Sequence, residues 1–277
     1  MIPEKGNPQI QVTVEDVGRA FVSVGANPGD LLLYHGSLSS MGTVVGGPRA
    51  VIDGALRAVA PDGTVAMPTL WYHGSTPPLN PADFDVRTSP SYVGALSEAM
   101  RTDPRSLRSN NFSHSVSAIG PRAVALTMDH GAGGESPAPW GYKAFADVSP
   151  WARLYEWDAL YCFIGVTMAV CTMKHYIESH LVGRILRQAP QARREAMRDG
   201  LTLMDRQGVW AYYDSQKMET RLAERGLVRY GQLGSATLRA IRTRPLVDVT
   251  TGILDAEPEA WLQPAFLEWA GEYLHER

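Results

Sequence analysis

The sequence has little cysteine, no excess of positive charge and no long apolar run, and each absence excludes a class of protein. Cys162 and Cys171 are the only 2 cysteines in 277 residues, too few for a disulfide framework. Cys162 lies in an apolar run, so we expect it to be a core residue rather than a nucleophile. The formal net charge is −3 and the pI is about 6.2, so no basic surface for nucleic acid is indicated.

No stretch is long and apolar enough to predict a membrane span, and residues 1–13 contain no apolar signal segment. We therefore expect a cytoplasmic protein that inserts into no membrane. What the chain does have is 44% hydrophobic residues over 277 positions, enough to bury a substantial core. We expect one α/β domain spanning residues 1–277, with a domain plus a smaller appendage as the alternative.

The first part of the chain has the pattern of a β-α-β unit. An apolar run at 30–35 follows Pro28-Gly29 and predicts a buried strand. A loop of small residues, 36–47, leads into a helix that has apolar residues on one face and Pro48 in its first turn. A second strand is expected at 63–67. This order predicts parallel strands packed against helices.

Further elements are expected along the rest of the chain. Ser89-Pro90 predicts the start of a helix that runs to Arg101, and Ser149-Pro150 predicts the start of another. The remaining patterns predict helices at 121–130, 173–188, 216–225 and from 257 onward, a strand at 159–165, and a hairpin that joins 201–204 to 209–213.

The 173–188 helix carries the most informative pair, His175 and Glu178. Its apolar stripe repeats every four residues, and at about 100° per residue the pair projects beside that stripe, about 60° apart. A carboxylate next to an imidazole fixes its tautomer and stabilises the imidazolium, which favours a general base. The alternative is a solvated His–Glu pair. His180 lies about 140° from His175, so the three side chains cannot converge on a metal.

The 36–47 loop is the expected ligand site. Ligands of open α/β sheets bind beyond the carboxyl ends of strands, where helix N-termini offer free N–H groups to anions. The glycine spacing in this loop matches neither the dinucleotide-binding GxGxxG pattern nor the P-loop. The loop also lacks the second glycine of a nucleophile elbow, which leaves a serine hydrolase using Ser37 as a minor alternative.

Motifs along nearly the whole sequence, taken in chain order, form one further pattern. They are His35-Gly36-Ser37-Leu38-Ser39-Ser40-Met41-Gly42 with Gly46-Gly47, the 63–69 strand, Phe84-Asp85, Gly94 with Glu98 and Arg101, Arg108-Ser109, His114-Ser115, Ser136-Pro137, His175 with Glu178, the 226–236 segment and Leu246-Val247-Asp248. Together they resemble the motifs of one family, the aminoglycoside 3-N-acetyltransferases. The resemblance implies a three-layer α/β/α sandwich around a mixed, largely parallel sheet.

The resemblance also implies a function. It indicates an acetyl-CoA-dependent N-acetyltransferase that acts without a metal on an amine of an aminoglycoside, an amino sugar or a related biosynthetic intermediate. His175 corresponds to the family's general base and Glu178 orients it. The residues expected to contact coenzyme A are His35, Ser37, Leu38, Ser39, Gly42, Arg108, Ser109, His114 and Ser115, and those expected near the substrate are Tyr72, Asp85 and Glu98.

Three features depart from the family pattern. Asn111 and Phe112 replace a His-Pro pair, and the stretch from Trp71 to Phe84 is poor in acids, although polycationic antibiotics call for carboxylates. In some family members an aspartate works with the His–Glu pair. This sequence has no secure counterpart of that aspartate, and Asp85 is the candidate substitute. These departures favour an amine other than a typical antibiotic. An alternative is an altered member that binds a pantetheine-bearing partner such as an acyl carrier protein. The sequence leaves a homodimer open.

Overall fold

A mixed sheet forms the centre of the computed structural model, which describes residues 3–71, 80–134, 136–204 and 206–274. Within these residues the sheet has seven strands in the order β5-β6-β4-β2-β7-β9-β8. The strands are β2 (Leu31–Gly36), β4 (Thr64–Pro68), β5 (Leu107–Arg108), β6 (Val116–Ile119), β7 (Leu160–Ile164), β8 (Arg229–Leu233) and β9 (Ala236–Arg242). A separate pair joins β1 (Gln11–Val12) to β3 (Thr43–Val44).

Parallel pairing is confined to the middle of the sheet. There β2 lies between β4 and β7 and runs parallel to both. The outer pairings, β4–β6, β5–β6, β7–β9 and β8–β9, are antiparallel. The mixed sheet is thus confirmed, and its parallel part is the central β-α-β unit that the first loop and helix predict.

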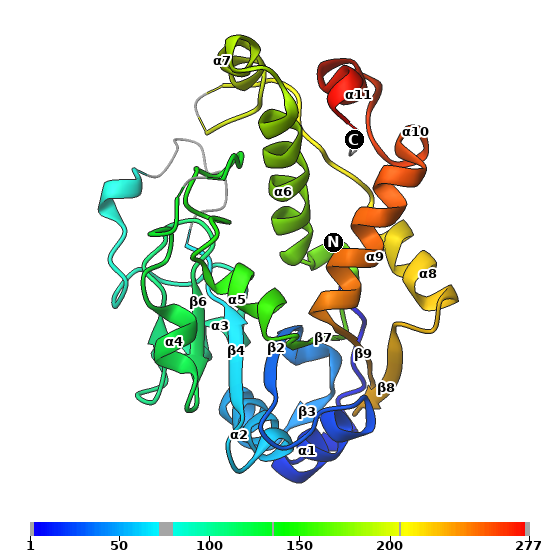
Figure 1. The fold of residues 1–277 in the computed structure, drawn as a ribbon. Helices are drawn as coiled ribbons and strands as arrows, with labels where there is room; N and C mark the ends of the chain where they lie inside the picture. The colour runs from blue at the N-terminus through cyan, green and yellow to red at the C-terminus, as the bar shows by residue number, and fades with distance from the viewer. Residues whose placement is uncertain (1–2, 72–79, 135, 205, 275–277) are drawn as a thin grey trace.

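Helices cover both faces of the sheet (Figure 1). On one face lie α1 (Val14–Ser23), α2 (Gly47–Val59) and α3 (Ala95–Thr102), whose apolar residues share one buried cluster. On the other lie α4 (Ala123–Thr127), α5 (Pro150–Glu156), α6 (Met173–Gln188), α8 (Ser215–Glu224) and α9 (Thr243–Ala256), which share a second cluster. The α/β/α sandwich is confirmed.

Successive side chains of the central strand β2 belong alternately to the two buried clusters. Leu31 and Leu33 belong to the cluster under α6, whereas Leu32 and Tyr34 belong to the cluster under α1 and α2. Successive side chains of a strand point to opposite faces, so an uninterrupted apolar run is what a strand covered on both faces requires.

Several expected elements have the predicted bounds. The sequence predicts a helix over 173–188, and α6 spans Met173–Gln188. Ser149 caps α5, since its hydroxyl accepts a hydrogen bond from the Ala152 N–H at 3.2 Å. Before α2 the chain turns at Gly46, whose φ of 88° is a left-handed conformation that favours glycine.

Other expectations are wrong. Ser89-Pro90 starts no helix; α3 begins at Ala95, because the Ser89 hydroxyl instead accepts from the Asp85 N–H within a turn. The 201–213 segment contains only isolated bridges, one of them parallel, so it is not a hairpin. The single helix expected from 257 onward is divided into two short helices, Pro258–Trp261 and Pro264–Ala270. Only Ala123–Thr127 of the 121–130 segment is helical.

The remaining short elements are α7 (Gln191–Asp199), α10 (Pro258–Trp261), α11 (Pro264–Ala270), η1 (Leu38–Ser40), η2 (Pro81–Asp83), η3 (Met168–Val170) and η4 (Gly271–Tyr273). In the part of the chain that the structure describes, none of the helices has the length and apolar character needed to cross a membrane.

Packing of α1 on the sheet gives a stability prediction. Phe21 is fully buried and its ring centroid lies 5.7 Å from that of Tyr34. Phe21→Ala should lower the free energy of unfolding by about 3–5 kcal/mol, because it removes buried apolar surface and leaves a cavity. Val22, next to it on the same helix, is 54% exposed. Val22→Ala should change stability by less than about 0.5 kcal/mol in the same urea titration. Equal effects of the two substitutions would contradict this packing.

Candidate active site

A cavity of about 990 Å³ opens at the carboxyl ends of the central strands. His35 and Gly36 end β2, Leu70 follows β4 and Val166 follows β7, and all four line the cavity. The N-terminal ends of α2, α3 and α6 also reach its wall, at residues that include Gly47, Ala95 and Lys174. Strand ends and helix N-termini therefore converge here, as the 36–47 loop predicts.

The His–Glu pair of α6 is formed. His175 Nδ1 lies 2.9 Å from Glu178 Oε2, and the His175 ring lines the cavity. The Glu178 side chain is 0% exposed and that of His175 is 23% exposed. The alternative of a solvated pair is therefore wrong. With Nδ1 directed at a carboxylate, we assign the proton to Nδ1, which leaves Nε2 as the basic nitrogen.

Two further groups contact the buried carboxylate of Glu178. The indole Nε1 of Trp210 donates to Oε2 at 3.1 Å, and the ammonium of Lys174 lies 3.7 Å from Oε1. A buried charge needs partners of this kind, since unpaired burial costs several kcal/mol, on the order of the desolvation penalty of one ion. The sequence pattern placed Glu178 beside the apolar stripe and gave no sign of this burial.

Aromatic rings enclose the His175 imidazole. Its ring centroid lies 4.0 Å from that of Trp140, 5.9 Å from His114 and 6.2 Å from Phe145. Burial, together with the neighbouring His175 and His130, holds the pKa of His114 well below its usual range, so His114 is neutral. Its Nδ1 is buried and has no hydrogen-bond partner among the described residues.

Asn111, which replaces a family histidine, has a structural role in presenting His114. Its Oδ1 accepts from the backbone N–H groups of Ser113 at 3.1 Å and His114 at 2.8 Å. The carbonyl of His114 in turn accepts from the Trp151 indole at 3.0 Å. Asn111 thus caps the turn that directs the His114 ring into the cavity wall.

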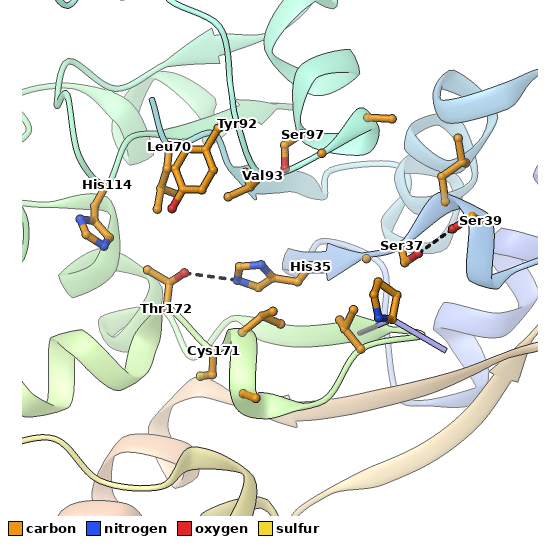
Figure 2. Close-up of a pocket in the computed structure, with 18 of the residues that line it drawn as sticks. His35, Ser37, Ser39, Leu70, Tyr92, Val93, Ser97, His114, Cys171 and Thr172 are labelled. Carbon is orange, nitrogen blue, oxygen red and sulfur yellow. Dashed lines mark hydrogen bonds between the residues drawn. The ribbon is translucent and has the colours of Figure 1, made fainter. Parts of the chain in front are cut away.

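His35 lies near the middle of the cavity, between the side that carries Leu70 and Val93 and the side that carries Cys171 and Thr172 (Figure 2). Its Nε2 is 2.7 Å from the Tyr161 hydroxyl, which itself accepts from the Thr172 N–H at 3.0 Å. We assign the phenol as donor to Nε2, which puts the proton on Nδ1. Burial lowers the pKa of His35 to about 3, so the ring is neutral.

Several residues expected to contact coenzyme A do line the cavity. They are His35, Ser37, Leu38, Ser39, Gly42 and His114. The hydroxyl of Ser37 pairs with that of Ser39 at 3.2 Å, as Figure 2 shows. Among the described residues no imidazole lies within hydrogen-bonding distance of Ser37 Oγ. An activated serine needs such a base, so the geometry gives the hydrolase alternative no support.

Arg108, Ser109 and Ser115 are not among the cavity-lining residues. Arg108 donates to Ser115 Oγ at 3.0 Å, to the Ser89 carbonyl at 2.5 Å and to the Thr69 carbonyl, so its donors already serve the protein. Ser109 Oγ accepts from the Val116 N–H and lies 2.9 Å from His130 Nδ1. The structure therefore puts these three side chains behind the cavity wall, where they hold β5 and β6 together.

The two expected substrate residues that the structure describes, Asp85 and Glu98, do not lie at the cavity. Tyr72 lies outside the described residues, as does His73. Asp85 is exposed and accepts from the Arg87 and Thr88 N–H groups, and these backbone bonds lower the pKa of its carboxyl. Glu98 is paired with Arg101, which lowers the pKa of Glu98. Neither carboxylate lines the cavity.

Sequence reasoning missed three side chains that shape the site: Lys174, Trp210 and Trp140. Lys174 had an available signal, since it directly precedes His175 and lies four residues before Glu178. Trp210 and Trp140 come from irregular segments, so no periodic pattern marks them.

The two cysteines are buried and free, and burial raises the pKa of Cys171 to about 12, as expected of thiols that are not nucleophiles. His180 turns back to the Tyr176 carbonyl.

Comparison with known proteins decides the family. The family model described as aminoglycoside 3-N-acetyltransferase matches residues 33–255. The chain belongs to the aminoglycoside 3-N-acetyltransferase family. This confirms the resemblance carried by the motifs.

Two curated relatives show how far the similarity extends. The aminoglycoside N(3)-acetyltransferase VII of Streptomyces paromomycinus is 32% identical, over 61% of this chain and 60% of that protein. The aminoglycoside N(3)-acetyltransferase IV of Salmonella sp. is 27% identical, over 88% of this chain and 87% of that protein. The aligned part thus spans less than two thirds of the first relative and most of the second.

Solved structures agree on the fold. The apoenzyme of aminoglycoside acetyltransferase AAC(3)-IVa superposes with a TM-score of 0.71, covers 96% of each chain and is 24% identical. AAC-IIIb in its binary complex with CoASH has a TM-score of 0.66 and 19% identity, and covers 92% of this chain and 99% of that one. Identities this low establish the shared family fold and no residue role.

Buried neutral histidines make stability depend on pH. Burial lowers the pKa of His35 to about 3 and of His130 to about 4, and lowers that of His114 strongly. Unfolded histidines titrate near pH 6.5, so the unfolded chain binds more protons below that pH. The free energy of unfolding should be highest above about pH 6.5 and fall on acidification, by up to about 1.4 kcal/mol per pH unit for each group.

Urea denaturation between pH 7 and pH 5 measures this fall. His130→Gln removes one of these groups and should reduce the slope by at most about one third, since burial also lowers the pKa of His180. His130 is a suitable position because its ring contacts Ser109 and the Ala144 carbonyl and does not line the cavity. A free energy of unfolding that is unchanged at pH 5 would contradict the neutral assignment of these rings.

Proposed function

We propose that this chain transfers an acetyl group from acetyl-CoA to a primary amine of an amino sugar, an aminoglycoside or a related biosynthetic intermediate, and that residues 1–277 form a single domain. The observation that carries the proposal is the His175–Glu178 pair at the wall of the large cavity, its carboxylate fully buried. Family membership supports the reaction class.

His175 acts as the general base. The attacking amine loses a proton to Nε2 as its nitrogen bonds to the thioester carbonyl carbon. Glu178, 2.9 Å from Nδ1, stabilises the imidazolium that results. When the C–S bond breaks, the thiolate takes the proton that His175 holds, so the base is regenerated. No covalent intermediate on the enzyme is needed.

The same cavity supports binding of the donor. The backbone of the 36–47 loop and the N-terminal end of α2 at Gly47 present N–H groups suited to the pyrophosphate of coenzyme A. His35 Nδ1–H and main-chain N–H groups of this loop are donors for the tetrahedral oxyanion. That AAC-IIIb was solved with CoASH agrees with this use of the fold.

The direct test is release of free thiol from acetyl-CoA in the presence of a panel of amines, with mass spectrometry of the acceptor. Acetylated amine and stoichiometric coenzyme A are expected. Failure to bind coenzyme A at millimolar concentration in calorimetry would refute the proposal. The alternative, a pantetheine-bearing partner such as an acyl carrier protein, predicts co-purification with that partner and no turnover of acetyl-CoA.

Removing the base gives a quantitative prediction. His175→Ala should lower kcat by about 10²- to 10⁴-fold, the usual contribution of a general base, while the Kd for coenzyme A stays near its wild-type value. Activity should recover in part at high pH, where the free amine no longer needs a base. A wild-type kcat at neutral pH in this variant would shift the role of base to another residue, with His114 the first candidate.

The carboxylate should matter less than the imidazole. In the wild-type protein the Trp210 indole Nε1 lies 3.1 Å from Glu178 Oε2. Glu178→Gln keeps an oxygen that can accept this hydrogen bond, but it removes the negative charge beside His175. We expect kcat to fall, but by less than in His175→Ala, because the imidazole remains and loses only the charge that orients it. Steady-state rates at neutral pH measure this, and a kcat identical to wild type would contradict the orienting role.

A further inference from the structure

The cavity wall carries no negative charge among its described residues. Of the residues that line it, none is aspartate or glutamate, and Lys174 is the side chain with a permanent charge at neutral pH. Polycationic acceptors need carboxylates for charge and hydrogen bonding, and the described wall supplies none.

Lys174 is held at the reacting end of the cavity. Its ammonium lies 3.7 Å from Glu178 Oε1 and 5.2 Å from the ring centroid of Tyr213, and its side chain is 18% exposed. The other oxygen of this carboxylate, Oε2, lies 2.9 Å from His175 Nδ1. The positive charge is therefore fixed beside the proposed base rather than free in solvent.

One buried carboxylate thus faces two basic side chains. Glu178 is fully buried and is not part of the cavity wall, whereas Lys174 is. An acceptor in the cavity therefore meets this cation and no acidic side chain of the described wall. Further amino groups on the acceptor would be repelled by Lys174, whereas an anionic group would be attracted to it.

Resting on the proposed acetyl transfer, we propose that the acceptor is an amine with one amino group and one anionic group, a carboxylate or a phosphate, that pairs with Lys174. Lys174 is then a specificity-determining residue. The acceptor class is an acidic amino sugar or amino acid rather than a polycationic antibiotic.

Matched acceptors test the inference. Glucosamine, glucosamine 6-phosphate and 2-amino-2-deoxygluconate share one amino sugar skeleton and differ in their anionic group, and apramycin represents the polycations. We expect at least one of the two anionic sugars to have kcat/KM about 10- to 100-fold above glucosamine, the range for one hydrogen bond to a charged group. Which of the two is preferred distinguishes phosphate from carboxylate.

Variants of Lys174 connect the preference to this side chain. Lys174→Met should lower the ratio of anionic to neutral kcat/KM by about the same 10- to 100-fold, and Lys174→Arg should retain it. The ratio is taken within each variant, so a general loss of activity does not affect it. Lys143→Met removes the same charge from an exposed position outside the cavity wall and should leave the ratio unchanged.

Calorimetric binding of each acceptor, without acetyl-CoA, separates this inference from the proposed function. If coenzyme A does not bind, acetyl transfer is refuted, and binding of the acceptors alone still decides the charge preference. Tighter binding of an anionic sugar, weakened in Lys174→Met, supports the inference. Apramycin bound or acetylated better than both anionic sugars, or a ratio unaffected by Lys174→Met, would overturn it.

Discussion

The burial of one carboxylate is the constraint on which the rest of the site depends. Glu178 is withdrawn from water on α6, and its two oxygens are shared among His175, Trp210 and Lys174. Removing any partner would leave a buried charge less compensated, so the arrangement fixes all four side chains at once. The orientation of the imidazole is therefore a property of the packed core and not of a flexible surface pair.

The fold supplies this burial from several directions. Helix α6 packs into the larger apolar cluster, and the 209–213 segment brings the Trp210 indole across to Glu178. Trp140 and Phe145 close over the imidazole from the loop before α5. The residues that hold the His175–Glu178 pair thus come from segments far apart in the chain, and the central sheet sets the place where they meet.

Backbone N–H groups and side chains contribute to the electrostatics of different parts of the cavity wall. Strand ends and helix N-termini provide N–H groups suited to phosphates, and this part of the wall relies on small residues that let a ligand approach the main chain. Elsewhere in the wall, His35, His114, His175 and Lys174 contribute side chains with nitrogen groups. His35 and His114 are kept neutral by burial, so they act there as hydrogen-bonding groups and add no charge.

The sequence by itself determined the β-α-β centre, the bounds of α6 and the spacing of His175 and Glu178, because these depend on local periodicity and capping. Its motifs also determined the family. Only the tertiary structure decided that Glu178 is buried, since the group that covers it, Trp210, lies 32 residues away in an irregular segment. It likewise decided that Arg108 and Ser109 brace the sheet and that Lys174 shares the carboxylate. A motif fixes which residues are present, whereas long-range packing decides which of them face the ligand.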